Sequence, residues 1–465
     1  MSSLQSKRCV AQGQGATAGS GCRRLLMPAA IILWIVVLWI FLCSAGALAA
    51  QEESSPDIKD DPSQDIFIEG IGFSKLILEI RRNADLEQYD TYGRYMPVLE
   101  RNLCWSGLFS LYGGDTHHCK LRGDPSRVDM RVSFMRRETG LRVRLQDAGV
   151  EGLVLYDEVL AMDRWITEKS VIRLVNNIAE RITGRPGLLG STIAFVLRQP
   201  GFAKLVVATD THARALKQIS TNSEINLLPH WSPDGEALVY TILGRNGSAV
   251  FYHNLVRPAD QLMKSRFLTA RTGLNTGGAF SRGGERVAFT MSRNGTADLY
   301  QYDFSKKQLK QLTFREGIET SADWSPDNKE IVFVSDRSGR PQVYLLDLVT
   351  GEDLRLTFDS TYNADPKWSP DGESILFTKR VNRRDQIHIM DKFGENVRAV
   401  TSGRYDAEQA SWSPDGKQIV FTSNRTGEFK LYIVSTDGSN LRRLTRTQAE
   451  FEETNPAWNA RRFEW

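Results

Sequence analysis

The strongest constraint on the fold is a short string that recurs through the second half of the chain. Trp-Ser-Pro-Asp followed by Gly or Asn occurs four times, with a degenerate copy that begins with Phe and a broken copy near the end. The six copies begin at Trp231, Phe280, Trp324, Trp368, Trp412 and Trp458, at intervals of 49, 44, 44, 44 and 46 residues. A period near 44 residues is typical of the four-stranded blades of a β-propeller.

The sequence between the copies has the pattern of strands and turns expected of a propeller blade. An apolar β-like run follows each string, as in ALVYT, RVAFT and QIVFTS, and two further turns separate two further runs. Proline presets the turn backbone, Asp hydrogen-bonds its own backbone, and Gly accepts a positive φ, so the string predicts a tight turn between antiparallel strands. We therefore interpret the recurring Asp as a turn residue rather than a catalytic or metal-binding one, and we expect the Trp to pack between blades.

The number of blades follows from the incomplete repeats at both ends. Residues 191–220 supply three strands without a Trp string, and residues 455–465 supply a Trp string without outer strands. Together they make a sixth blade, which closes the ring and removes the exposed edges of an open array. The predicted fold is mainly β: a six-bladed β-propeller over 188–465, closed by N- and C-terminal strands and preceded by a small α/β domain over 66–187.

The expected α/β domain has short segments of both periodicities. The apolar spacing predicts helices over 92–112 and 163–183, and the second ends at Thr183-Gly184. Alternating β-like runs predict strands in 66–82, 128–136, 141–146 and 152–160, of which the middle two form a hairpin.

The N-terminus predicts export. Residues 25–43 are uncharged and apolar, follow Arg23-Arg24, and precede the small-residue pattern Ala47-Leu48-Ala49. This is the pattern of a signal peptide over 1–49. Cleavage releases the chain and retention anchors it, and in both cases the bulk of the chain is exported. Residues 50–65 are acidic and polar and predict a flexible segment.

Charge and cysteine content narrow the partners. The chain has 59 basic and 56 acidic residues, a net charge of +3, and loss of four basic residues with the signal leaves −1. This balance argues against a nucleic-acid partner. Cys104 and Cys119 remain after the signal; a disulfide between them and a buried free Cys104 both fit the sequence.

The antiparallel blade predicts two distinct faces. The Ser-Pro-Asp-Gly turns and the third turns of the blades share one, which we name the turn face. The second turns and the loops between blades share the other, which we name the loop face. Its inter-blade loops lead into the innermost strands, so we expect them to ring the channel mouth, with a polar, acidic inner rim inside a basic outer ring.

The signal, the α/β domain, the six repeats and the final Asn-Pro-Ala-Trp together resemble the TolB family, periplasmic components of the Tol-Pal envelope system. The resemblance runs from the signal to the C-terminus. It implies a non-catalytic, monomeric protein, peripheral to membranes, that supports outer-membrane integrity and constriction at cell division. It also implies two partners: the peptidoglycan-associated lipoprotein at the channel mouth, and the inner-membrane protein TolA at residues 50–62.

The residues expected to contact the lipoprotein lie in the inter-blade loops, and all but Leu274 are polar or charged. They are Glu224, Asn226, Leu274, Asn275, Glu319, Thr320, Tyr362, Asn363, Asp406, Glu408, Glu453 and Asn455. Reversing the charge of Glu319 and Asp406 is expected to weaken partner binding without loss of stability.

Two other functions remain open. An exported propeller enzyme, a lyase or peptidase-like protein, is the first, but the sequence contains no Gly-x-Ser-x-Gly string. His230, beside Trp231, is the one histidine expected to face the channel, and no catalytic residue, cofactor or metal ligand set is predicted. The second is an exported binding scaffold for another protein or glycan.

Overall fold

The computed structural model describes residues 75–81, 90–112, 128–137, 140–161, 168–256, 265–293 and 295–462. The predicted signal peptide, the acidic segment 50–65 and Cys119 lie outside these residues. Cys104 is disulfide-bonded, and its pairing with Cys119 stays a prediction. Within the described ranges, no helix combines the length and the apolar character needed to cross a membrane.

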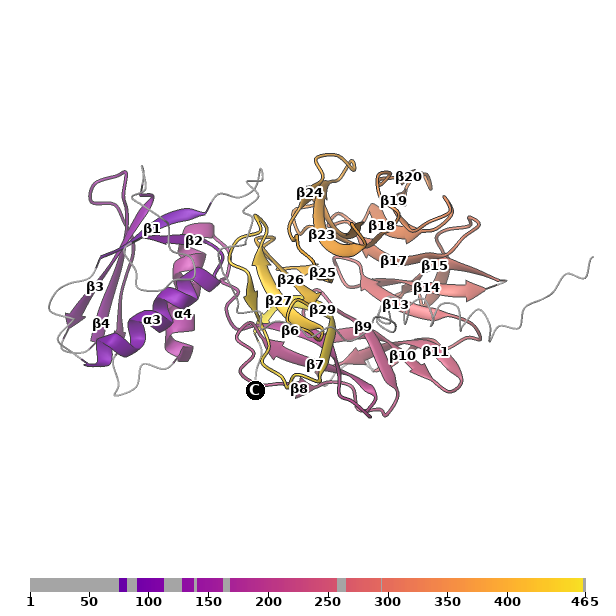
Figure 1. The fold of residues 1–465 in the computed structure, drawn as a ribbon, viewed down its shortest axis with the longest axis horizontal. Helices are drawn as coiled ribbons and strands as arrows, with labels where there is room; N and C mark the ends of the chain where they lie inside the picture. The colour runs from indigo at the N-terminus through magenta and orange to yellow at the C-terminus, as the bar shows by residue number, and fades with distance from the viewer. Residues whose placement is uncertain are drawn as a thin grey trace, which may run out of the picture. The chain divides into compact units, whose positions relative to one another are not determined.

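The first region is a five-stranded sheet with two helices on one face (Figure 1). The strand order is β2-β1-β3-β4-β5, in which β1 pairs in parallel with β2 and β3 and the other pairs are antiparallel. Its elements are β1 (Leu76–Arg81), α3 (Asp90–Trp105), β2 (Phe109–Tyr112), β3 (Met130–Arg137), β4 (Gly140–Asp147), β5 (Val154–Ala161) and α4 (Glu168–Thr183). Alternate strand residues such as Leu78, Val132 and Val143 are fully buried against the apolar stripe of α4.

One predicted element of this region is wrong. The helix expected over 92–112 ends at Trp105, and Phe109–Tyr112 form strand β2 instead. Gly107 adopts a φ of 74° directly after the helix, a left-handed conformation that ends helices and favours glycine. The apolar residues beyond it alternate between buried and half-buried positions, which is the period of a strand rather than of a helix.

The second region is a six-bladed propeller of four-stranded antiparallel blades, as the repeats predict (Figure 1). Five blades are continuous in sequence. Their strands are β9 (Ile225–Trp231), β10 (Ala237–Gly244), β11 (Gly247–Asn254) and β12 (Arg266–Thr269); β13 (Asn275–Phe280), β14 (Arg286–Arg293), β15 (Thr296–Asp303) and β16 (Gln308–Gln311); β17 (Glu319–Trp324), β18 (Glu330–Ser335), β19 (Gln342–Asp347) and β20 (Asp353–Arg355); β21 (Asn363–Trp368), β22 (Ser374–Val381), β23 (Arg384–Asp391) and β24 (Arg398–Ala399); and β25 (Ala407–Trp412), β26 (Gln418–Ser423), β27 (Lys430–Ser435) and β28 (Arg442–Arg443).

The sixth blade joins the two ends of the propeller, in strand order β29-β6-β7-β8. Its strands are β6 (Ser191–Arg198), β7 (Lys204–Asp210), β8 (Lys217–Gln218) and β29 (Glu452–Arg462). β29 is the innermost strand and pairs antiparallel with β6, with Trp458 opposite Ile193. The predicted closure is therefore confirmed: β29 covers the inner edge of β6, and β29 takes the innermost place that β9, β13, β17, β21 and β25 take in the other blades.

The recurring Asp residues are turn residues, as predicted. In the first copy the Asp234 carboxylate accepts hydrogen bonds from the Ser232 hydroxyl and from the Glu236 N–H, at 2.5 and 2.9 Å. The same Ser–Asp bond recurs at Asp327, Asp371 and Asp415. Because each carboxylate is used by its own turn, the string encodes the shape of the turn.

The tryptophans connect neighbouring blades, again as predicted. Trp412 packs in one apolar cluster with Leu376 and Ile389 of the preceding blade. Its indole N–H donates to the carbonyl of Lys367 at 3.1 Å, across the blade boundary. Trp324 makes the equivalent bond to Ala279, whereas the buried indole N–H of Trp368 has no partner among the residues that the structure describes.

This difference gives a matched pair of substitutions. Trp412→Phe removes an interblade hydrogen bond, whereas Trp368→Phe removes a donor that has no partner in the described part of the chain. Both lose similar ring volume, so we expect Trp412→Phe to lower the free energy of unfolding by about 1 kcal/mol more than Trp368→Phe. Urea unfolding of both variants measures the difference, and equal losses would show that the indole bond contributes nothing net.

Candidate functional site

A ring of left-handed backbone positions lines the propeller channel. Each innermost strand has an irregular register before its Trp or Phe. The residue three positions before that aromatic has a φ between 49° and 75° in every blade. The six residues are Leu228, Gly277, Ser321, Asp365, Gln409 and Asn455, and all six border a narrow cavity of about 90 Å³. Bulges of this kind redirect side chains. Here the six bulges lie around the same narrow part of the channel.

Acidic side chains crowd one side of this channel. Glu408 precedes the ring residue Gln409, and the charges of Asp385, Asp365 and Asp406 act on it. Burial, reinforced by these carboxylates, raises the pKa of Glu408 to about 8. Burial also raises the pKa of Asp365. Arg380 supplies the local positive charge through a bidentate pair with Asp385 at 2.8 Å.

Five of the twelve predicted contact residues are not on the surface. Each stands five positions before the Trp or Phe of its repeat and has no exposed area: Asn226, Asn275, Glu319, Asn363 and Glu453. They bond their own chain where one blade crosses to the next. Asn275, for example, donates to the carbonyls of Ser248 and Arg271 at 2.9 and 2.6 Å. We therefore expect these buried side chains to support the inter-blade crossings rather than to contact a partner directly.

Glu319 shows the physical reason most clearly. Its carboxylate is ion-paired with Arg337, which also contacts Asp353 at 2.8 Å. Burial raises the pKa of Glu319, although Thr313 and Arg337 act in the opposite direction. Reversing this charge would place Lys against the half-buried Arg337 at a fully buried position, so we expect Glu319→Lys to lower stability as well as any partner binding.

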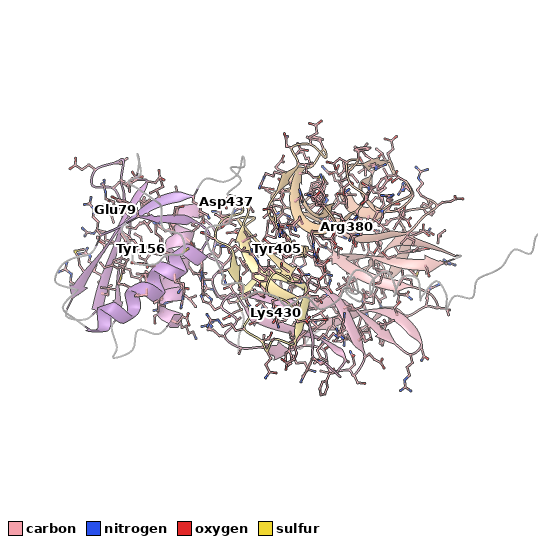
Figure 2. All side chains as sticks on the ribbon, in the orientation of Figure 1. Glu79, Tyr156, Arg380, Tyr405, Lys430 and Asp437 are labelled. Atoms are coloured by element: carbon pink, nitrogen blue, oxygen red, sulfur yellow. The ribbon has the colours of Figure 1, made fainter. Side chains whose placement is uncertain are left out.

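The other predicted contact residues differ in accessibility. Leu274 is buried, and the remaining six are half-buried: Glu224, Thr320, Tyr362, Asp406, Glu408 and Asn455. The guanidinium of Arg380 lies 4.4 Å from the ring centre of Tyr362, and Arg384 contacts Asp406 at 3.0 Å. The acidic rim and the basic ring are therefore partly paired with one another. Figure 2 shows Arg380 and Tyr405 among the side chains of the propeller.

Two prominent side chains of the loop face were missed. Phe314 and Phe358 are 75% and 70% exposed. Each follows a Leu-Thr pair that ends an outer strand, so each begins an inter-blade loop, in adjacent blades. The repeated Leu-Thr-Phe string at 312–314 and 356–358 was the available signal. Exposed aromatic residues are common anchors of protein interfaces.

The channel contains polar chemistry but no assembled metal site within the described ranges, where no group of three or more His, Cys, Asp or Glu side chains is placed to hold an ion. His230 borders the channel, as predicted, and its Nε2 lies 3.6 Å from Asp323 Oδ1. Lys367 Nζ lies 3.4 Å from the same oxygen. Burial alone would raise the pKa of Asp323, but Lys367, the His230 side chain and the Trp368 N–H together hold it below its ordinary value.

The fold and the site define a closed six-bladed β-propeller with a narrow polar channel and a preceding α/β sheet. The family model described as the TolB β-propeller domain matches residues 179–462. Because this match covers more than half of the chain, the protein belongs to the TolB β-propeller family.

Individual relatives agree with this assignment. TolB from Acinetobacter baumannii superposes with a TM-score of 0.64 at 26% identity, covering 83% of this chain and 97% of that chain. The Tol-Pal system protein TolB of Desulfosudis oleivorans is 32% identical over 132 residues, 28% of each chain. That of Dechloromonas aromatica is 28% identical over 229 residues, 46% of this chain and 51% of the relative. The chain thus spans between about a quarter and a half of the length of these two curated relatives.

Proposed function

We propose that the protein is a non-catalytic component of a Tol-Pal system in the periplasm, and that its loop face binds the peptidoglycan-associated lipoprotein. The observation that carries the proposal is the superposition on TolB from Acinetobacter baumannii across 97% of that chain, since it covers the α/β region as well as the propeller. Propellers that share only the blades would leave the α/β region unmatched.

The loop face has the composition of a protein-binding surface. Phe314 and Phe358 supply apolar area, and the guanidinium of Arg355 lies 4.8 Å from the ring centre of Phe358. Half-buried Tyr362 and Asp406 add polar groups nearer the channel. An apolar anchor beside partly paired charges favours a specific protein partner, because the anchor contributes affinity and the charges contribute specificity.

The N-terminal segment has a separate part in the proposal. Residues 50–62 contact a TolA-like inner-membrane protein, by analogy with the position of this segment in the family. The two contacts together support outer-membrane integrity and constriction at cell division.

Binding of residues 50–465 to the periplasmic domain of the same organism's lipoprotein tests the proposal. We expect Phe314→Ser with Phe358→Ser to weaken binding about tenfold or more, because exposed aromatic anchors commonly contribute about 1–2 kcal/mol each. Calorimetry measures the affinity, and thermal unfolding checks that the variant folds.

The matched control is Phe393→Ser. Phe393 is 69% exposed, but it lies in the third turn of its blade and hence on the turn face. We expect this variant to bind like the parent. Absence of binding by the parent protein would refute the lipoprotein proposal, and equal losses at Phe393 and Phe358 would refute the assignment to the loop face.

A further inference from the structure

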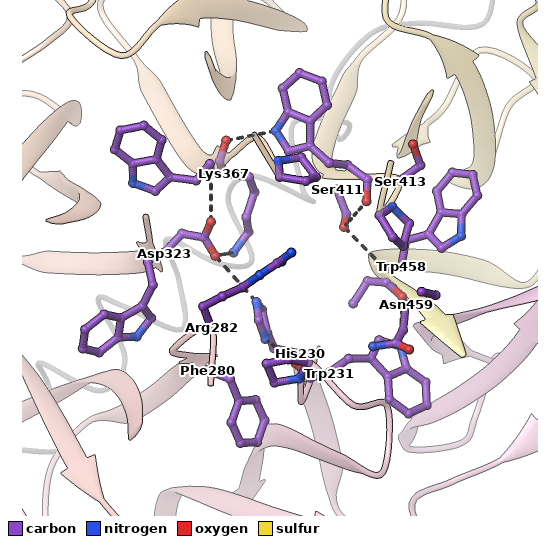
Figure 3. Close-up of a pocket in the computed structure, with 18 of the residues that line it drawn as sticks. His230, Trp231, Phe280, Arg282, Asp323, Lys367, Ser411, Ser413, Trp458 and Asn459 are labelled. Atoms are coloured by element: carbon purple, nitrogen blue, oxygen red, sulfur yellow. Dashed lines mark hydrogen bonds and ion pairs between the residues drawn. The ribbon is translucent and has the colours of Figure 1, made fainter. Parts of the chain in front are cut away.

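A second cavity lies on the turn face, opposite the proposed lipoprotein surface. It has a volume of about 480 Å³ and is bounded by the ends of all six innermost strands and by the turns that follow them (Figure 3). We name it the turn-face basin. Its size lies within the range of pockets that hold small molecules or short peptide segments.

The wall of the basin repeats one position of the turn. The residue two positions after each Trp or Phe borders the cavity: Pro233, Arg282, Pro326, Pro370, Pro414 and Ala460. Four of the six are proline, so this row of positions in the wall is largely apolar. Arg282 is the exception, and it belongs to the degenerate string that departs from the Ser-Pro-Asp-Gly pattern.

The backbone of Arg282 is hydrogen-bonded, whereas its guanidinium is not bonded to any described residue. Its N–H donates to the Asn328 side chain of the next blade at 2.7 Å. Its exposed guanidinium makes no hydrogen bond or ion pair with any residue that the structure describes. Figure 3 shows the side chain reaching from its turn across the basin, past His230. An unpaired guanidinium inside a cavity is available to a ligand.

The floor of the basin contains a second cation, Lys367, which is paired with Asp323, so Asp323 does not neutralise Arg282. Asp323 accepts from the Trp368 N–H at 2.9 Å and lies between His230 and Lys367. Its charge is therefore matched by Lys367. The basin has one carboxylate against two permanent cations, and the surplus charge is that of Arg282.

We infer that the turn-face basin binds a carboxylate-bearing peptide segment, with the carboxylate on Arg282 and neighbouring side chains against the proline wall. Guanidinium presents a fork of donors that matches a carboxylate in two parallel hydrogen bonds. A sugar acid would fit this wall less well than a peptide, because a sugar ring usually stacks on an exposed aromatic side chain. The five tryptophans that border the basin are only 5–8% exposed.

Fluorescence polarisation with a labelled peptide library tests the inference on the chain from residue 50 onward. The probes are fluoresceinated pentapeptides with Asp or Glu at the centre, each prepared with a free and with an amidated C-terminus, and matched peptides with Asn or Gln. We expect acidic probes to bind, neutral amidated probes to bind at least about tenfold more weakly, and Arg282→Gln to lose about tenfold for the acidic ones. A difference between free and amidated ends tells a terminal carboxylate from a side-chain carboxylate.

Arg293→Gln is the control, because Arg293 is an exposed arginine of the same blade in the second turn, on the loop face. It should leave probe binding unchanged. Equal binding by parent and Arg282→Gln, or by acidic and neutral probes, would overturn the inference. The inference would also be overturned if galacturonate displaced the labelled acidic probes at lower concentrations than unlabelled acidic peptides do. Lipoprotein binding by Arg282→Gln is expected to match the parent, so this test and that of the proposed function fail independently.

Discussion

Removing residues 452–465 is expected to abolish the cooperative unfolding of the propeller. The deletion takes away β29, the innermost strand of the sixth blade, and leaves β6 with an unpaired edge. It also removes Trp458, which is 8% exposed and packs with Ile193 and Phe195. Loss of a buried aromatic side chain alone costs about 3–5 kcal/mol, a large part of the stability of an ordinary domain.

A buried polar network is lost in the same deletion. Glu453 is fully buried and accepts from the Leu431 N–H at 3.0 Å and from the hydroxyls of Thr445 and Thr447. Lys430, labelled in Figure 2, donates to the carbonyls of Gln448 and Phe451 in the loop that leads to β29. Without Glu453, the Leu431 N–H and the hydroxyls of Thr445 and Thr447 lose their acceptor, and unpaired buried polar groups are costly.

Circular dichroism during heating and size-exclusion chromatography measure the outcome. Removal of residues 463–465 alone is the control, since β29 ends at Arg462. We expect that variant to melt like the parent protein, and the longer deletion to aggregate without a sharp transition. A sharp transition in the longer deletion, within a few degrees of the parent, would show that five blades hold together without the closing strand.

Periodicity explains why so much of the propeller was predictable. Six copies of one string place the innermost strands, and the partial repeats at 191–220 and 455–465 complete each other in a single blade. In the α/β region no repeat exists, and there Phe109–Tyr112 was assigned to a helix. Only three residues, 106–108, separate α3 from β2, and their one glycine is a weak signal without a second copy for comparison.

The burial of five predicted contact residues could not be predicted for a different reason. A polar residue in a loop that enters a blade looks solvated in sequence, but Asn275 and Glu453 are fully buried at the crossings between blades. Buried backbone groups at these crossings are hydrogen-bonded by polar side chains. Polarity alone therefore does not distinguish a residue on the surface from one buried at a crossing between blades. Phe314 and Phe358 are the opposite case, since they are apolar and yet exposed.

Glu408→Gln is expected to remove a pH dependence of stability. The pKa of Glu408 is raised to about 8 in the folded protein, chiefly by burial and further by Asp385, Asp365 and Asp406. In the unfolded chain a glutamate titrates near about pH 4.3. Between these values the folded state holds a proton that the unfolded state has released, so the free energy of unfolding falls as pH rises. Full stability is present below the unfolded value, and the loss is complete above about pH 8.

The size of the effect follows from the same shift. Each unit of pKa corresponds to about 1.36 kcal/mol, and because Glu408 is only half-buried, screening reduces the total to about 2 kcal/mol between about pH 5 and about pH 9. Gln is isosteric and uncharged, so the variant should match the parent at low pH and exceed it in stability at high pH. Urea unfolding at both pH values measures this, with Glu428→Gln as an exposed control that should follow the parent. Parallel pH profiles for the parent and Glu408→Gln would show that Glu408 is ionised at neutral pH and that water in the channel, rather than burial, governs the acidic side of the ring.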